Sequence, residues 1–293
     1  MKIINLLLVV AIAATSCVAQ KKLDLKNPED ALKAARKIQA SLKDGEECIY
    51  YWEGSVYSRI PQERDKLLFT YYGMNVRSTK RDTFKGKEGY KQVSREILLY
   101  LDPETGKVSN TWKNPWTGKE LAVMHIANDP VNSRGVMTSD MIGTPFSVMD
   151  GRAFWNIEVP LLYPNPMAAE TYKDYVGTTH KMYQAIEMFN FSVPEKELCD
   201  ATKQRADDVN ISWARVCQWL PWMEMGDKEG WLVFNGQGKK IMNFELLPVE
   251  LKDYINKEHP EYKKAPPLDD KRPNETSWTY YKKWLDKQKP AGK

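Results

Sequence analysis

The sequence predicts an α+β protein built mainly from antiparallel β-structure, as an up-and-down barrel or a strongly curved half-barrel with terminal helices. Segments rich in aromatic and β-branched residues recur at intervals of about 10–20 residues, and turn motifs separate several of them. Helical periodicity is confined mostly to the two ends, and no β-α-β alternation occurs. We therefore expect about ten strands in one large sheet, which tends to curl and close. A two-sheet sandwich is the alternative.

The first twenty residues have the order of a secretory signal. Lys2 precedes an almost entirely apolar run over 3–14, which is too short to span a membrane, and small residues follow it. Cleavage after a signal peptide of residues 1–19 leaves a mature chain of 20–293. Alternatively, Cys17 lies in a degenerate lipobox and becomes a lipidated N-terminus. We expect an exported protein, periplasmic or extracellular, that contacts a membrane only if Cys17 is lipidated.

The first element of the mature chain is an N-terminal helix over 27–43. Asn27 caps it, Pro28 lies in its first turn, and Asp44-Gly45 follows its last apolar residue. Strands come next, and turn motifs at 102–106 and 114–118 predict that three of them form an antiparallel meander. The strands predicted in this part of the chain are 48–52, 67–72, 93–101, 108–112 and 121–127.

The second half begins with a segment, 128–150, that has little periodicity and predicts a long loop. Asn235-Gly236 predicts the turn of a β-hairpin. A helical and Pro-rich tail covers 247–293, with a helix from 247 to about 257 and a short one near 277–286. The strands predicted here are 153–159, 181–193, 211–219, 231–234 and 241–244.

Composition limits the class of protein. With 42% hydrophobic and 11% aromatic residues, the chain can bury a core, and we predict a single β-rich domain over 20–293. The formal net charge of +4 is small and dispersed, so we predict no nucleic-acid partner. The partner that we expect is a small-molecule ligand, and the oligomeric state stays open.

Cysteine and histidine usage gives no sign of a metal or a cofactor. Cys48, Cys199 and Cys217 follow the signal, and both a Cys199–Cys217 disulfide and buried free thiols fit the sequence. The histidines lie far apart and no C-x-x-C occurs, so we predict no metal site. No G-x-S-x-G, Walker or G-x-G-x-x-G motif is present, which disfavours serine hydrolases and nucleotide-binding proteins.

Two positions suggest acid–base chemistry. Arg95 and Glu96 are neighbours in a strand, so their side chains point to opposite faces and one of them points inward. A buried Glu96 either acts as an acid or base or pairs with an arginine. His125 ends a strand just before Asp129 in a turn, which suits an acid–base pair, or a core histidine with Asp129 capping the turn.

The densest aromatic cluster runs from 212 to 227 and contains three Trp and two Met residues. It predicts either a filled core or a wall on which a ligand stacks. Arg215 and Glu224, which are charged residues among these aromatics, form an ion pair or anchor a polar ligand, and Glu224 is a further acid–base candidate. Other Trp residues lie near Asn or Pro at turns, and we expect them to converge at one end of the barrel. The predicted ligand-binding residues are Trp112, Asn114, Trp116, Arg215, Trp219, Trp222, Asn274 and Trp278.

Five separated motifs carry a resemblance to a known family. They are Asn114–Gly118, Asn128–Val131, Tyr163–Pro166, Trp219–Gly226 and Pro273–Trp278. In this order they are similar to the signatures of the DUF1838 family of uncharacterised proteins, and the similarity runs from about Glu47 to Trp284. The resemblance implies one domain, because the motifs are spread throughout the chain. It implies no activity, cofactor or catalytic residue.

We therefore expect an exported protein that binds a small, largely apolar or aromatic ligand in a pocket lined by Trp, Tyr and Met. One alternative is a cofactor-free isomerase, lyase or hydrolase that uses His125 with Asp129, or an inward Glu96 or Glu224, as acid–base groups. Another is a carbohydrate-binding surface of exposed Trp and Asn residues. A catalytic function needs two titratable groups that face one accessible pocket.

Overall fold

The computed structural model describes residues 22–288, and its strands form one large antiparallel sheet and one small one. The order in the large sheet is β6-β3-β2-β1-β12-β11-β10-β9-β8, with β7 paired to β3. Its strands are β1 (Cys48–Arg59), β2 (Lys66–Phe84), β3 (Lys87–Leu101), β6 (Ile126–Asn128), β7 (Met137–Thr138), β8 (Phe146–Met149), β9 (Arg152–Pro164), β10 (Met182–Pro194), β11 (Asn210–Cys217) and β12 (Trp231–Ile241). This confirms the predicted fold class.

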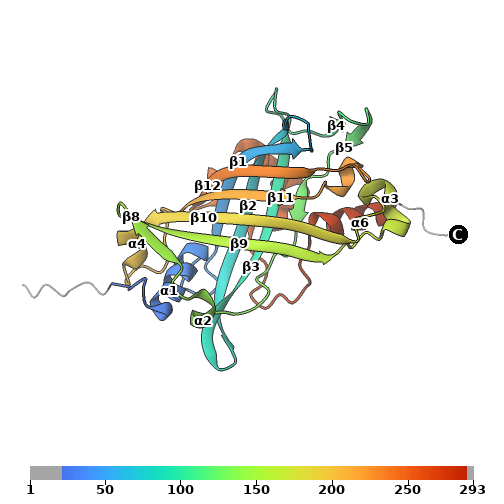
Figure 1. Ribbon diagram of the computed structural model, residues 1–293. Coiled ribbons are helices and arrows are strands. Elements are labelled where there is room, and N and C mark those ends of the chain that lie inside the picture. Colours follow the sequence, from blue (N-terminus) through green and yellow to red (C-terminus); the bar gives the residue numbers. More distant parts are fainter. Residues whose placement is uncertain (1–21, 289–293) are drawn as a thin grey trace, which may run out of the picture.

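The large sheet is open and strongly curved (Figure 1). In this view β2 and β3 run steeply, whereas β9 and β10 lie across the molecule. Four strands separate β3 from β10 in the sheet order, which would place them about 24 Å apart in a flat sheet. Glu96 of β3 and Glu187 of β10 nevertheless line one cavity. Among the described strands, the edges β6 and β8 do not pair, so the sheet is curved like a half-barrel without closing.

Alternation along the strands gives the sheet two apolar faces. On the convex face, Ile97 and Leu99 of β3 pack with Leu251 and Ile255 of α5 (Val249–Glu258). The larger core fills the concave face and contains aromatic residues from most strands, such as Tyr50, Trp52, Tyr71, Trp213 and Phe234.

The helices lie around the sheet. α1 (Pro28–Gln39), with Asn27 as its N-cap as predicted, and α2 (Ser139–Ile142) lie at one end, and α3 (Ala169–Val176) and α6 (Ser277–Gln288) lie toward the other (Figure 1). The remaining helical segments are α4 (Glu195–Cys199) and the 3-10 turns Pro221–Met223, Phe244–Leu246 and Pro260–Lys263. Within 22–288 no helix has the length and apolarity needed to cross a bilayer.

The predicted hairpin at Asn235-Gly236 is wrong, because β12 continues through it to Ile241. The glycines serve close packing here. A Cβ on Gly236 would lie 2.1 Å from the Tyr71 hydroxyl, and one on Gly238 would lie 2.0 Å from the Tyr51 carbonyl oxygen. Neither glycine has positive φ, so both fit an extended strand against large neighbours.

The predicted meander after β3 is also wrong in part. β4 (Thr111–Lys113) and β5 (Glu120–Ala122) pair with each other in the small sheet. Of the predicted meander, a single bridge at Val108 and the strand β6 pair with β3. The segment predicted as a long loop, 128–150, contains β7, α2 and β8. Cys48, Cys199 and Cys217 are free and buried, so the Cys199–Cys217 disulfide that the sequence left open does not form. The signal peptide and Cys17 lie outside the described residues.

Candidate functional site

A cavity of about 250 Å³ lies on the concave face of the sheet. Its wall combines a polar part from β2, β3, β10 and β11 with an aromatic part from β1, β10 and β11. The polar residues include Asn75, Arg77, Gln92, Ser94, Glu96, Glu187 and Arg215. The apolar residues include Trp52, Ile157, Val159, Phe189, Phe191, Ile211 and Trp213.

Strand alternation brings the polar groups together. Ser94 and Glu96 have the same parity on β3, and Asn75 and Arg77 lie opposite them on β2, in the pairs Asn75–Glu96 and Arg77–Ser94. Arg95 points to the other face, where its Nε donates to Asp129 Oδ1 over 2.8 Å. The expectation that Arg95 and Glu96 point to opposite sides is thereby confirmed, and Glu96 is the residue at the cavity.

The carboxyl group of Glu96 is positioned by a hydrogen bond and has little contact with bulk water. The side-chain amide of Asn128 donates to Glu96 Oε1 over 2.6 Å. Burial raises the pKa of Glu96, and the Glu187 carboxylate raises it further, against the opposing effects of Asn128, Arg215 and Arg77. Glu96 therefore retains its proton to a higher pH than an ordinary glutamic acid.

Glu187 faces the same cavity and is paired. Arg215 Nη1 donates to Glu187 Oε1 over 2.7 Å, and Arg215 Nη2 donates to the Tyr183 hydroxyl over 2.5 Å. The two charged side chains are 17% and 12% exposed, so water screens their attraction weakly. Of the two alternatives for Arg215, the ion pair forms, with Glu187 as the partner in place of Glu224.

Arg77 is the second guanidinium of the wall. Its Nε donates to Asn75 Oδ1 over 2.6 Å and its Nη1 donates to Gln39 Oε1 over 2.7 Å. Its guanidinium carbon lies 4.6 Å from the centre of the Tyr50 ring. Both hydrogen-bond acceptors are neutral amides.

The aromatic wall is made of rings that contact one another edge to face or in parallel. The Trp52 and Trp213 rings are 6.0 Å apart in an edge arrangement, and the Phe189 and Phe191 rings stack at 6.5 Å. The indole N–H groups of Trp52 and Trp213 are buried, and neither has a hydrogen-bond partner within residues 22–288. This wall offers stacking surface for a ligand.

His125 and Asp129 have separate partners. The backbone N–H of Tyr100 donates to His125 Nδ1 over 3.1 Å, and the imidazole packs against the Tyr100 and Tyr254 rings. Burial lowers the pKa of His125 to about 4. No hydrogen bond or ion pair joins His125 to Asp129 in the described part of the chain.

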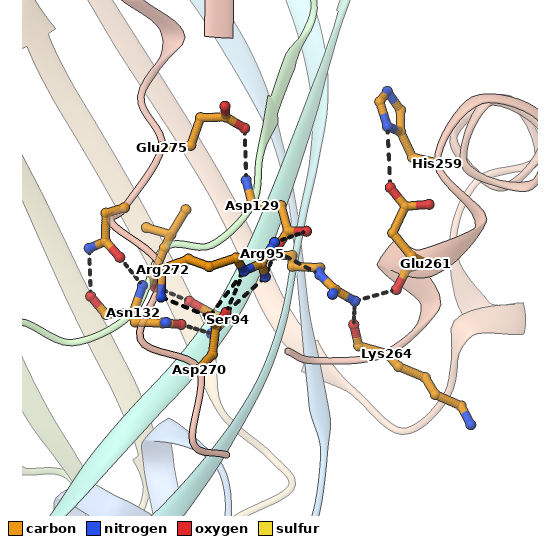
Figure 2. Close-up of polar contacts among 12 residues, drawn as sticks. Ser94, Arg95, Asp129, Asn132, His259, Glu261, Lys264, Asp270, Arg272 and Glu275 are labelled. Atoms are coloured by element: carbon orange, nitrogen blue, oxygen red, sulfur yellow. Dashed lines mark hydrogen bonds and ion pairs between the residues drawn. The ribbon is translucent and has the colours of Figure 1, made fainter. Parts of the chain in front are cut away.

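Asp129 belongs to a polar network outside the cavity (Figure 2). Its carboxylate accepts hydrogen bonds from Arg95 and Arg272, and Arg272 also binds Asp270. The network fastens the C-terminal segment 259–276 to the edge of the sheet.

This network also fixes the rim of the cavity. Asn274 Oδ1 accepts a hydrogen bond from the Asn132 N–H over 2.8 Å, and Asn132 Oδ1 accepts one from the Ser94 N–H over 3.1 Å (Figure 2). Asn132 and Ser94 both line the cavity. The predicted site residue Asn274 is thus an exposed residue that holds the rim.

The other predicted site residues lie outside the cavity lining. Glu224 accepts a hydrogen bond from Lys119 over 2.7 Å. Asn114 is buried and its side-chain amide donates to the Met223 carbonyl oxygen over 3.0 Å. Trp278 is buried against Tyr183. Four rings contact one another away from the cavity lining, within the same core: Trp112, Trp116, Trp219 and Trp222.

The site residues that the sequence interpretation missed are Glu187, Arg77, Asn75 and the aromatic residues of the wall. One signal could have found Glu187. It is the single charged residue in an alternating series on β10 that is otherwise apolar: Tyr183, Ala185, Glu187, Phe189, Phe191 and Val193. A lone charge on a strand face that is otherwise apolar has to meet either a counter-charge or a cavity.

Across residues 22–288, no group of three or more His, Cys, Asp or Glu side chains is arranged to hold a metal ion. No curated protein matches the chain. The family model described as a protein of unknown function (DUF1838) matches residues 45–285. That match covers most of the chain and agrees with the motif resemblance. The chain therefore belongs to the DUF1838 family.

Proposed function

We propose that this protein binds a small, largely apolar or aromatic molecule in the cavity on the concave face of its sheet. The observation that carries the proposal is the composition of the wall, in which aromatic rings face the partly buried polar groups Glu96, Glu187 and Arg215. Such a combination of apolar surface with a few convergent polar groups is typical of ligand sites. An apolar cavity of about 150 Å³ is known to hold benzene, so the 250 Å³ here suits a molecule of one or two rings.

The proposal is tested by native mass spectrometry of the purified protein, followed by tryptophan-fluorescence titration with benzene-, indole- and naphthalene-based compounds. Trp52 and Trp213 report on the site because both line it. We expect a retained small molecule or saturable quenching. Val159→Phe fills the cavity and abolishes binding, whereas Val148→Phe, at a 48% exposed position on β8, preserves it. Equal binding by the two variants, or no binding by the native chain, contradicts the proposal.

A second proposed function is acid–base catalysis, which Glu96 supports through its raised pKa and its position across the cavity from Glu187. A carboxyl group with a raised pKa beside a second carboxyl group at one cavity suits proton transfer, in which one group donates and the other accepts. Substrate screens of Glu96→Gln test this idea, with Glu88→Gln at an exposed position of β3 as the matched control. Loss of turnover in Glu96→Gln alone supports it, and turnover that persists in Glu96→Gln excludes Glu96 as the acid.

We also propose export, on the basis of the sequence of residues 1–19. Cell fractionation and intact-mass measurement test it. A chain that begins at Gln20 in the periplasm or medium supports cleavage, and an acylated chain that begins at Cys17 supports a lipid anchor. An uncleaved cytoplasmic chain contradicts both.

A further inference from the structure

We infer that the ligand of this cavity is an organic acid, whose carboxylate pairs with Arg77 and whose apolar body lies on the aromatic wall. The inference rests on the proposed binding function and adds the chemical class of the ligand. Its basis is a buried cation at the cavity wall that has no anionic partner of its own.

Arg77 is 7% exposed, so its charge has lost most of its contact with bulk water. Its two side-chain hydrogen bonds go to the neutral oxygens of Asn75 and Gln39, and its third interaction is with the Tyr50 ring. Within residues 22–288, no carboxylate forms an ion pair with it. A buried charge without a counter-charge is destabilising, and an anionic ligand would relieve that destabilisation.

The other charges at the wall do not supply the missing anion. Glu187 is already paired with Arg215 at 2.7 Å. Glu96 retains its proton more strongly than usual, since burial and Glu187 both raise its pKa, and the effect of Arg77 on it is smaller than those of Asn128 and Arg215. Glu96 Oε1 accepts its hydrogen bond from Asn128, and within residues 22–288 no ion pair joins Glu96 to Arg77. The charge of Arg77 therefore remains for a ligand.

A second buried cation lies near Arg77. Lys240 is the register partner of Tyr50, whose ring contacts Arg77, and its pKa is lowered chiefly by burial, with Arg77 among the groups that lower it further and Cys48 and Asp207 opposing. This cation is fully bonded to main-chain carbonyl groups, so it adds potential without offering a free donor. A carboxylate at Arg77 would also reach the polar residues Gln92 and Ser94, while its apolar body faces Trp213 and Phe189.

The experiment compares acids with their neutral amides by calorimetry near pH 7. The probes are phenylacetate, 3-phenylpropanoate and 2-naphthoate, each beside its primary amide, which has nearly the same shape. Charge-assisted hydrogen bonds to a buried guanidinium favour the acid, and we expect the best acid to bind about 10- to 100-fold more tightly than its amide. Arg77→Met removes this preference. Arg81→Met keeps it, because Arg81 lies on the same strand but is 78% exposed.

The outcomes separate this inference from the proposed function. Acids that outbind their amides in the native chain and in Arg81→Met, but not in Arg77→Met, support it. Amides that bind at least as tightly as acids to the native protein overturn the inference and leave the binding function standing. Binding of neither series to the native protein overturns both. If Arg77→Met does not fold, the comparison of acid with amide in the native protein still decides.

Discussion

The two buried lysines near α1 and the two arginines at the cavity on the concave face have different kinds of hydrogen-bond partner. Near α1, each buried lysine has three main-chain partners, one for each proton of its ammonium group. Lys240 Nζ donates to the carbonyl oxygens of Lys37, Ile38 and Ala40 at 3.0, 3.4 and 2.8 Å. Lys37 Nζ donates to those of Glu197, Leu198 and Asp200 at 3.3, 2.6 and 3.0 Å.

At the cavity, the cations are held by side chains. Arg77 binds two neutral amides, and Arg215 binds Glu187 and the Tyr183 hydroxyl. Main-chain carbonyls are fixed by the fold, whereas side chains that face a cavity can exchange partners when a ligand enters. Burial of a charge therefore does not by itself mark a functional site. The identity of its partners separates a structural charge from one that is free to bind.

Lys240→Met tests whether a buried lysine bonded to main-chain carbonyl groups stabilises the fold. Of the variants considered, it should reduce the stability of the protein most. The substitution removes the ammonium donor from three carbonyl groups at the C-terminal end of α1, where Lys240 is 5% exposed. The Lys37 carbonyl keeps the Ala206 N–H and the Ile38 carbonyl keeps the Tyr50 hydroxyl, so the Ala40 carbonyl loses most. We expect the free energy of unfolding to fall by about 3 kcal/mol. Denaturant unfolding followed by circular dichroism measures it.

Lys239→Met is the matched control, since Lys239 is the exposed neighbour on β12. Its effect should stay within about 0.5 kcal/mol. Equal losses for the two variants would mean that Lys240 does not stabilise the end of α1.

The pH dependence of stability tests the environment of Glu96 at the cavity. Because the folded chain holds the Glu96 proton more tightly than the unfolded chain, this residue favours folding most below the ordinary glutamate pKa of about 4.3. The contribution of Glu96 to the free energy of unfolding decreases as the pH rises toward its raised pKa in the folded chain, and it is constant above that pKa. We expect a slope of up to about 1.4 kcal/mol per pH unit in that window, which Glu96→Gln removes.

His125 contributes with the opposite sign, since its pKa is lowered to about 4 and its stabilising effect increases as the pH rises from there toward 6.5. The measurement is therefore the difference between native and Glu96→Gln unfolding curves, in which the His125 contribution cancels. Glu88→Gln, on the exposed end of β3, should leave the native curve unchanged. A flat difference curve for Glu96→Gln would show that Glu96 titrates normally.

Much of the fold follows from local signals in the sequence. Asn27 and Pro28 mark the start of α1 because capping is a local interaction. The strands extend further than their apolar centres, as in β2, where polar residues after Thr79 continue the hairpin to the turn at Lys85 and Gly86. The hairpin predicted at Gly236 was wrong, because a glycine is needed there for close contact with Tyr71, which lies on a strand distant in sequence.

The site was predictable only in part. Glu96 could be found because parity on a strand is local, and Arg215 because a charge among aromatic residues is conspicuous. Their convergence with Glu187 and Arg77 depends on the curvature of the whole sheet, which brings β3 to β10 across four strands. The turn-located Trp residues did converge, but on one another, as the rings of Trp112, Trp116 and Trp222 show. Local sequence patterns identify candidate site residues, and the curvature of the sheet determines which of them meet at one cavity.

Arg77→Met gives the smallest expected change in stability and the sharpest contrast with Lys240→Met. Both variants replace a buried cation with an apolar chain, but Arg77 has only two neutral side-chain partners, both of which line the cavity and can meet water there. Removal of an unpaired buried charge offsets the lost hydrogen bonds and ring contact. We expect the unfolding free energy of the ligand-free chain to change by less than about 1 kcal/mol, in either direction. A loss as large as that of Lys240→Met would mean that Arg77 serves the fold, and that the partners of a buried cation do not distinguish structure from binding.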